Sequence, residues 1–129
     1  METIKRKILI IDDDNFLVDM YALKFIENNF EVHTAFNGAQ ALDKLKGGLS
    51  PNVMLIDVIM PEMDGFEMLT QINNEKICPS CVKVILSNKS QQADIDRGDE
   101  LGVAGYIVKA SSTPQEVINQ VIDILGKKL

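Results

Sequence analysis

Residues 8–14 read Ile-Leu-Ile-Ile-Asp-Asp-Asp, an unbroken apolar run followed at once by three acids. A second apolar run, Val53–Ile56, is likewise followed by an acid, Asp57. Continuous apolar runs of this length are typical of strands that are covered on both faces, as in a parallel sheet. The sequence therefore predicts two buried strands that each end in carboxylates.

Three further strand-like runs continue the pattern along the chain: Val32–Ala35, Val84–Leu86 and Tyr106–Val108. Longer amphipathic segments separate these runs, so strand and helix alternate five times. This alternation predicts an α/β fold, a doubly wound (βα)₅ parallel sheet with helices on both faces. We expect residues 1–129 to form a single domain, since this length is typical of one.

Polar and small residues mark where the predicted helices begin and end. Asn15 is a candidate cap for the first helix, and the second runs from near Asn37 to Gly47. The third helix is expected to start at Asp64, and the fourth to open at Ser90. Thr113, followed by a proline at the first helical position, caps the fifth.

Composition limits the possible functions. Apolar residues make up 46% and charged residues 25% of the chain, a balance that excludes disorder. No apolar run is long enough to span a membrane, and no signal peptide is recognisable, so we expect a cytoplasmic protein. The net charge of −6 argues against direct binding of nucleic acid or anionic lipid.

The predicted strands bring five polar side chains to one edge of the sheet: Asp12, Asp13, Asp57, Ser87 and Lys109. Clustered carboxylates repel one another unless a cation is present, and Mg²⁺ suits a site of carboxylates plus a phosphate. The lysine and the serine can bind phosphoryl oxygens. These are the parts that phosphoryl transfer needs, and Asp57 is the best candidate for the nucleophile.

Four segments in order give these residues a family likeness. The chain resembles the CheY-like receiver domains of two-component response regulators, over essentially its whole length. The likeness implies a flavodoxin-like sheet with strand order 2-1-3-4-5. The matching segments are Ile8–Asp14, Leu55–Gly65, Val84–Ser87 and Gly105–Lys109.

The resemblance assigns a role to each residue of the cluster. Asp57 would accept a phosphoryl group from a phosphohistidine of a sensor histidine kinase or phosphotransfer protein. Asp13 would bind Mg²⁺ directly, Asp12 largely through water, and the Ile59 backbone carbonyl would complete the ligands that the protein supplies together with Asp57. Lys109 would pair with a phosphoryl oxygen.

The resemblance also implies a conformational switch. Ser87 would bind the phosphoryl group and draw its loop inward, and Tyr106 would swing inward with it. The face made by the fourth helix, fifth strand and fifth helix would then bind a different protein target, or a second copy of the chain. Because the chain stops soon after the fifth helix, we expect no output domain, although a receiver trimmed from a longer regulator stays an alternative.

Several positions depart from the family pattern or tune it. Most receivers follow the lysine with a cis proline, whereas Lys109 precedes Ala110, so we expect a trans bond and a reshaped loop. Asn88 replaces a smaller residue after Ser87 and is expected to narrow the phosphate entrance. Ile59 and Lys89 occupy the two positions that tune the lifetime of the phosphoryl group in this family, and bulky Ile59 predicts slow self-dephosphorylation.

Two rival functions remain open. Asp12 and Asp14 form the Asp-x-Asp motif of haloacid-dehalogenase-like phosphatases, although Phe16 stands where threonine or valine is usual. Asp14 also suits the entry to the first helix. The second rival is a pseudo-receiver that binds partners without phosphorylation, which retention of all four parts of the site disfavours.

The remaining reactive side chains are predicted to be structural. His33, the only histidine, lies in a strand rather than on an exposed helix. Cys78 and Cys81 form a Cys-Pro-Ser-Cys quartet that follows a helix and precedes a strand, which is not the usual setting of a redox dithiol. A zinc site would require two further ligands that the sequence does not supply.

Overall fold

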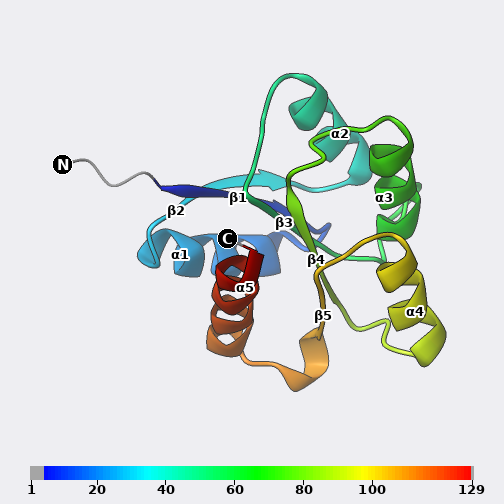
Figure 1. Cartoon of the computed structure of the whole chain (residues 1–129). Helices are drawn as coiled ribbons and strands as arrows, with labels where there is room; N and C mark the ends of the chain where they lie inside the picture. The colour runs from blue at the N-terminus through cyan, green and yellow to red at the C-terminus, as the bar shows by residue number, and fades with distance from the viewer. Residues whose placement is uncertain (1–4, 129) are drawn as a thin grey trace.

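The computed structural model describes the backbone of residues 5–128 and the side chains of residues 5–126. Within these residues, five strands and five α-helices alternate (Figure 1). The segment at residues 1–4, on which the expectation of no signal peptide partly rests, lies outside the described residues. The elements are β1 (Arg6–Ile11), α1 (Asn15–Glu27), β2 (Phe30–Ala35), α2 (Gly38–Lys46), β3 (Val53–Ile56), α3 (Gly65–Asn74), β4 (Val82–Ser87), α4 (Gln92–Glu100), β5 (Gly105–Val108), a 3₁₀ turn η1 (Lys109–Ser111) and α5 (Pro114–Lys128).

The five strands form one parallel sheet in the order β2-β1-β3-β4-β5. The predicted fold class and the strand order that the resemblance implied are both confirmed. The chain reverses direction across the sheet between β1 and β3, the point at which such folds bind ligands. In the register, Ile11 lies opposite Ile56, so the acids that follow β1 and β3 come out side by side.

Side-chain alternation along the central strands builds two hydrophobic cores, one on each face of the sheet. Ile8 and Ile10 of β1 pack into the core with α1 and α5, whereas Leu9 and Ile11 pack into the core with α2 and α3. All four are at most 2% exposed. Because both faces are covered, these strands require apolar residues at every position, which is why the sequence pattern was readable.

Two predicted helix starts were wrong by one or two residues. Asp14, rather than Asn15, caps α1: its carboxylate accepts a hydrogen bond from the Leu17 N–H at 3.1 Å. The fourth helix begins at Gln92 instead of opening at Ser90. In that helix the Asp94 carboxylate accepts the N–H of Gln91 at 3.1 Å, which closes the first turn.

The other boundaries agree with the sequence. Asn37 caps α2, which gives way to Gly47, and Asp64 caps α3 in a reciprocal pair with Glu67. Thr113 accepts the N–H of Glu116 before α5. Within the described residues, none of the helices combines the length and the apolar character that a membrane span requires.

The first residue of α3, Gly65, lies close against the backbone of the two residues that follow β3. The N–H of Gly65 donates to the Val58 carbonyl at 2.8 Å, and a Cβ atom at position 65 would lie 2.9 Å from the Val58 Cα and also overlap the Asp57 carbonyl. Because the obstructing atoms are backbone, they cannot rotate away. Glycine at 65 therefore fixes the loop that leaves Asp57.

Replacing Gly65 with alanine is expected to lower the free energy of unfolding by about 1–3 kcal/mol, the usual cost of overpacking. Gly126→Ala is the matched control, since nothing lies within 4 Å of its Cβ position in α5. The control should gain about 0.5–1 kcal/mol from the better helix propensity of alanine. Urea titrations measure both changes, and equal stability of Gly65→Ala and the parent would contradict the close approach.

Candidate functional site

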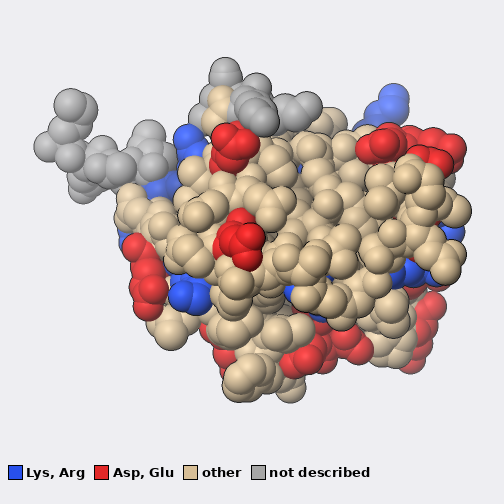
Figure 2. Space-filling model, turned by 90° about the horizontal axis from the view of Figure 1, so that it is seen from below, with Lys and Arg blue, Asp and Glu red and all other residues tan. Residues whose placement is uncertain are grey.

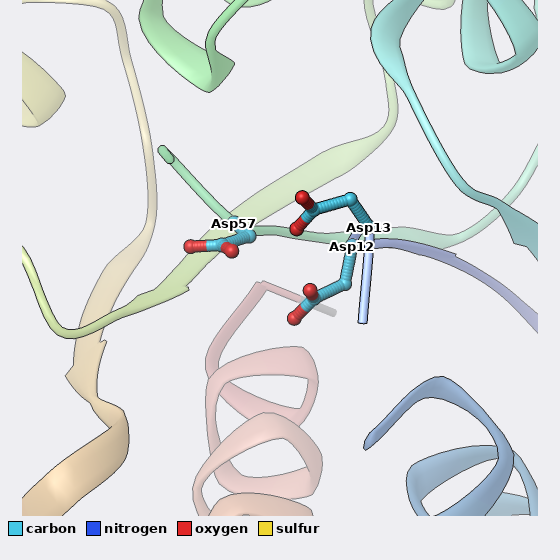
Figure 3. A group of neighbouring side chains, drawn as sticks. All are labelled: Asp12, Asp13 and Asp57. Carbon is cyan, nitrogen blue, oxygen red and sulfur yellow. The ribbon is translucent and has the colours of Figure 1, made fainter. Parts of the chain in front are cut away.

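Three carboxylates gather where β1 and β3 end. Asp12 and Asp13 follow β1, and Asp57 follows β3; one ligand oxygen from each lies within 4.8 Å of the others. Figure 3 shows the side chains leaving the two strand ends, with Asp12 and Asp13 turned to the side on which Asp57 lies. Asp12 and Asp57 are 5% and 7% exposed, whereas Asp13 faces solvent.

The donor set of this cluster matches a hard divalent cation. Mg²⁺ prefers oxygen ligands, and it keeps several waters when one or two carboxylates hold it. The buried Asp12 and Asp57 and the exposed Asp13 each direct one carboxylate oxygen to the same site, which is open to solvent on the side of Asp13. Ile59, whose carbonyl the resemblance adds to the ligand set, lies in the loop after Asp57, and its N–H donates to the Asp57 Oδ1 at 3.4 Å.

Lys109, the residue directly after β5, reaches this cluster from the start of η1. Its Nζ donates to Asp12 Oδ2 at 2.6 Å and to Asp57 Oδ2 at 3.2 Å, and its side chain is 13% exposed. Burial by itself lowers the pKa of Lys109, but the two carboxylates outweigh burial and raise it. The site therefore holds a permanent positive charge against its two buried acids.

The negative charge of Asp57 is only partly stabilised by its surroundings. Burial raises the pKa of Asp57, and the negative charge of Asp12 raises it further. The ammonium of Lys109 and the nearby Ser87 hydroxyl act in the opposite direction without cancelling the effect. A carboxylate that is only partly compensated in this way gains from a further cation.

Ser87 and Tyr106 connect the site to α4. Ser87 is fully buried at the end of β4, where its Oγ accepts the N–H of Lys89 at 3.2 Å. The Tyr106 hydroxyl donates to the Lys89 carbonyl, and the Tyr106 ring lies 3.3 Å from the Cβ position of Gly98 in α4. The Lys89 ammonium pairs with Asp94 at 3.5 Å.

The structure thus brings together Asp12, Asp13, Asp57 and Lys109, with Ser87 beside Asp57; their chemical roles stay predictions. Asp14 is used as a helix cap and is not in the cluster. Sequence reasoning missed the bonding of Asn88, whose Oδ1 accepts the Ala110 N–H at 2.7 Å. The signal was available, because a residue other than proline at position 110 leaves an N–H to be satisfied.

The other reactive side chains lie away from this cluster. His33 of β2 shares a hydrogen bond with Glu31 at 2.7 Å. Cys78 and Cys81 are free thiols in the loop between α3 and β4, at the opposite edge of the sheet. Burial raises the pKa of Cys81 to about 12, so this thiol stays protonated and unreactive at neutral pH.

Known proteins carry the same architecture and sequence pattern. The family model of the response regulator receiver domain matches residues 8–122. The chain belongs to this family, the receiver domains of response regulators.

Two curated relatives come from Bacillus subtilis. The transcriptional regulatory protein ResD is 33% identical over 128 residues, which cover 98% of this chain and 50% of ResD. The alkaline phosphatase synthesis transcriptional regulatory protein PhoP is 31% identical over 122 residues, or 95% of this chain and 49% of PhoP. The chain therefore spans about half the length of these relatives.

Solved structures agree on the fold. A CheY-like receiver domain protein from Methanospirillum hungatei superposes with a TM-score of 0.87 at 22% identity, covering 97% of each chain. The receiver domain of Francisella response regulator 1452 gives a TM-score of 0.85 at 27% identity, covering 97% of this chain and 100% of that one.

The partial burial of the Asp57 charge is expected to lower the free energy of unfolding. Because its folded-state pKa is raised, ionising Asp57 disfavours the folded state, and stability is lost as the pH rises through that pKa. Asp57→Asn should raise the Tm at pH 7 by about 4 °C, the shift that ~1 kcal/mol produces in a domain of this size.

The gain from Asp57→Asn should shrink as the pH falls and the parent carboxyl becomes protonated. Asp99→Asn, the same change at an exposed position in α4, is the control and should leave the Tm nearly unchanged. Thermal unfolding followed by circular dichroism measures both. A Tm below that of the parent at pH 7 would mean that pairing with Lys109 outweighs burial.

Proposed function

We propose that this chain is a phosphoacceptor receiver, in which Asp57 takes a phosphoryl group from a phosphohistidine with the help of Mg²⁺. The observation that carries the proposal is the position of the Lys109 ammonium between the buried carboxylates of Asp12 and Asp57. A solvated turn would not bury two acids and a lysine together, because that arrangement is costly unless the charges serve one another.

The chemistry follows from these charges. An Asp57 oxygen attacks phosphorus as the phosphorus–nitrogen bond of phosphohistidine breaks, and the departing imidazole takes up a proton. Lys109 neutralises the phosphoryl oxygens, and the Ser87 hydroxyl donates to another of them. Asp13, Asp57 and the Ile59 carbonyl would hold Mg²⁺, with Asp12 acting largely through water, and the ion would supply charge neutralisation at the acceptor.

The proposed role is signalling rather than turnover. Residues 1–129 act as a single receiver domain, in the cytoplasm, between a sensor histidine kinase or phosphotransfer protein and a downstream protein target or output domain. Phosphorylation moves Ser87 and Tyr106, and so changes the face of α4, β5 and α5 that binds the target or a second copy. The Tyr106–Lys89 hydrogen bond supports this link between β5 and the loop before α4.

Surface charge supports a protein partner over direct binding to nucleic acid. The chain carries a net charge of −6. On the face shown in Figure 2, acidic groups are spread around broad uncharged areas, and the described basic side chains are scattered rather than gathered into a patch. Phosphate backbones bind to continuous basic surfaces.

Labelling with acetyl phosphate and Mg²⁺ tests the acceptor directly. The expected product is a mixed anhydride on Asp57, formed as acetate leaves; Asp57→Asn and removal of Mg²⁺ by chelation should each reduce labelling to background. Mass spectrometry of borohydride-trapped peptides identifies the acceptor. Label on Asp12 would support the phosphatase alternative, and a parent chain that takes up none and binds no beryllofluoride would be a pseudo-receiver.

The exposed side chain of Ile59 bears on the lifetime of the product. It is 60% exposed beside Asp57, and an aliphatic group at this position cannot orient an attacking water. Self-dephosphorylation is therefore expected to be slow, on a scale of minutes or longer. Ile59→Asn should speed the decay, because an amide can hydrogen-bond water; loss of the phosphoryl group from the parent within seconds would refute this prediction.

A further inference from the structure

The carboxyl ends of β4 and β5 are joined by a side chain. Their parallel ladder ends at the pair Ser87 and Val108. One residue past Ser87, the Oδ1 of Asn88 accepts the N–H of Ala110 at 2.7 Å. The Asn88 side chain thus continues the connection between the two strands after the backbone ladder has stopped.

The Ala110 N–H, which donates to Asn88, has no acceptor within its own 3₁₀ turn. Ala110 lies in η1, and the first N–H groups of a helical turn have no carbonyl inside the turn to bind. The turn closes on itself only later, where the Ser112 N–H donates to the Lys109 carbonyl at 3.3 Å. Asn88 therefore satisfies a donor that would otherwise depend on solvent.

This bond lies next to both phosphoryl-binding side chains. Asn88 directly follows Ser87, and Ala110 directly follows Lys109, whose ammonium contacts Asp12 and Asp57. Asn88, Lys109 and Ala110 also line the same groove, of about 320 Å³, between α1 and the segment after β5. The bond thus fixes the backbone from which the lysine reaches the acidic cluster.

We propose that Asn88 is a positioning residue, which holds Lys109 in register with Ser87 through the Ala110 N–H. The inference rests on the proposed function, because its consequence is tighter binding of a phosphoryl group. Asn88 and Ala110 act as one unit: the asparagine has a use only where residue 110 carries an N–H, which proline does not have. Since neither partner is charged, the bond does not compete with the acidic cluster for Lys109.

The test compares two variants of the full chain with the parent. Asn88→Leu has a similar size and no acceptor, whereas Asn88→Asp keeps the acceptor oxygen. In ¹H–¹⁵N spectra, Asn88→Leu should shift the Ala110 amide proton upfield and speed its exchange with solvent, and Asn88→Asp should keep it downfield and protected. Ser90→Ala, at an exposed position in the same loop, should leave this signal unchanged.

The functional measurement uses Mg²⁺ with beryllofluoride as a phosphoryl mimic. Asn88→Leu should weaken beryllofluoride binding about fivefold, the change expected from losing one hydrogen bond, and slow acetyl phosphate labelling to a similar degree. Its affinity for Mg²⁺ alone should change less than its affinity for beryllofluoride, because the carboxylates that would hold the ion are themselves unaltered. A role that only stabilised the fold would lower the Tm without separating these two affinities.

Three results would overturn the inference. An Ala110 amide that is the same in Asn88→Leu and the parent would mean that the hydrogen bond does not form. A shifted amide with unchanged beryllofluoride binding would reduce Asn88 to a structural residue, while leaving the proposed function intact. If the parent itself neither bound beryllofluoride nor became labelled on Asp57, the proposed function would fail, and the role of Asn88 with it.

Discussion

The ammonium of Lys109, held between the carboxylates of Asp12 and Asp57, is the interaction on which the site depends. Two acids that are 5% and 7% exposed repel each other and lose hydration, and the lysine compensates only in part, since the pKa of Asp57 is still raised. Burying charges in this way does not stabilise a small domain. It creates a place where added positive charge is favourable.

The parallel sheet makes this arrangement possible. Every strand presents its carboxyl end at the same edge, and the order β2-β1-β3-β4-β5 sets β1 beside β3, so that their acids emerge as neighbours. β5 lies two strands away from β3, and only a side chain as long as lysine spans that distance to reach the acids. Because helices cover both faces of the sheet, the central strands consist mostly of apolar residues. The polar residues of the site therefore lie at or just beyond the strand ends.

The loop geometry around this edge shows how local departures from a family pattern are accommodated. The described residues contain no cis peptide bond, so the bond between Lys109 and Ala110 is trans, as expected. Asn88 accepts the N–H of Ala110, and the expectation that its side chain narrows the phosphate entrance stays a prediction. Two residues that both depart from the family pattern, and that lie 22 positions apart, thus form one hydrogen bond. The tight approach of Gly65 to the backbone of Asp57 and Val58 fixes the neighbouring loop in a similar way.

The sequence by itself determined the elements of this protein, because their signals are local. Apolar runs covered on both faces identify strands, and Asn37, Asp64 and Thr113 identify helix starts through hydrogen bonds that reach only three residues along the chain. Where two capping residues adjoin, as at Asp14 and Asn15, local preference does not choose between them, and the hydrogen bond to Leu17 does.

The sequence predicted that Asp12, Asp57 and Lys109 meet at one edge of the sheet, but only the tertiary structure decided which atoms of these groups are in contact. Lys109 and Asp12 are 97 positions apart, and Asn88 and Ala110 are 22 apart. No periodicity encodes such contacts. They arise when strand order and register place separate strand ends at one edge, and the final distances depend on how loops and long side chains pack there.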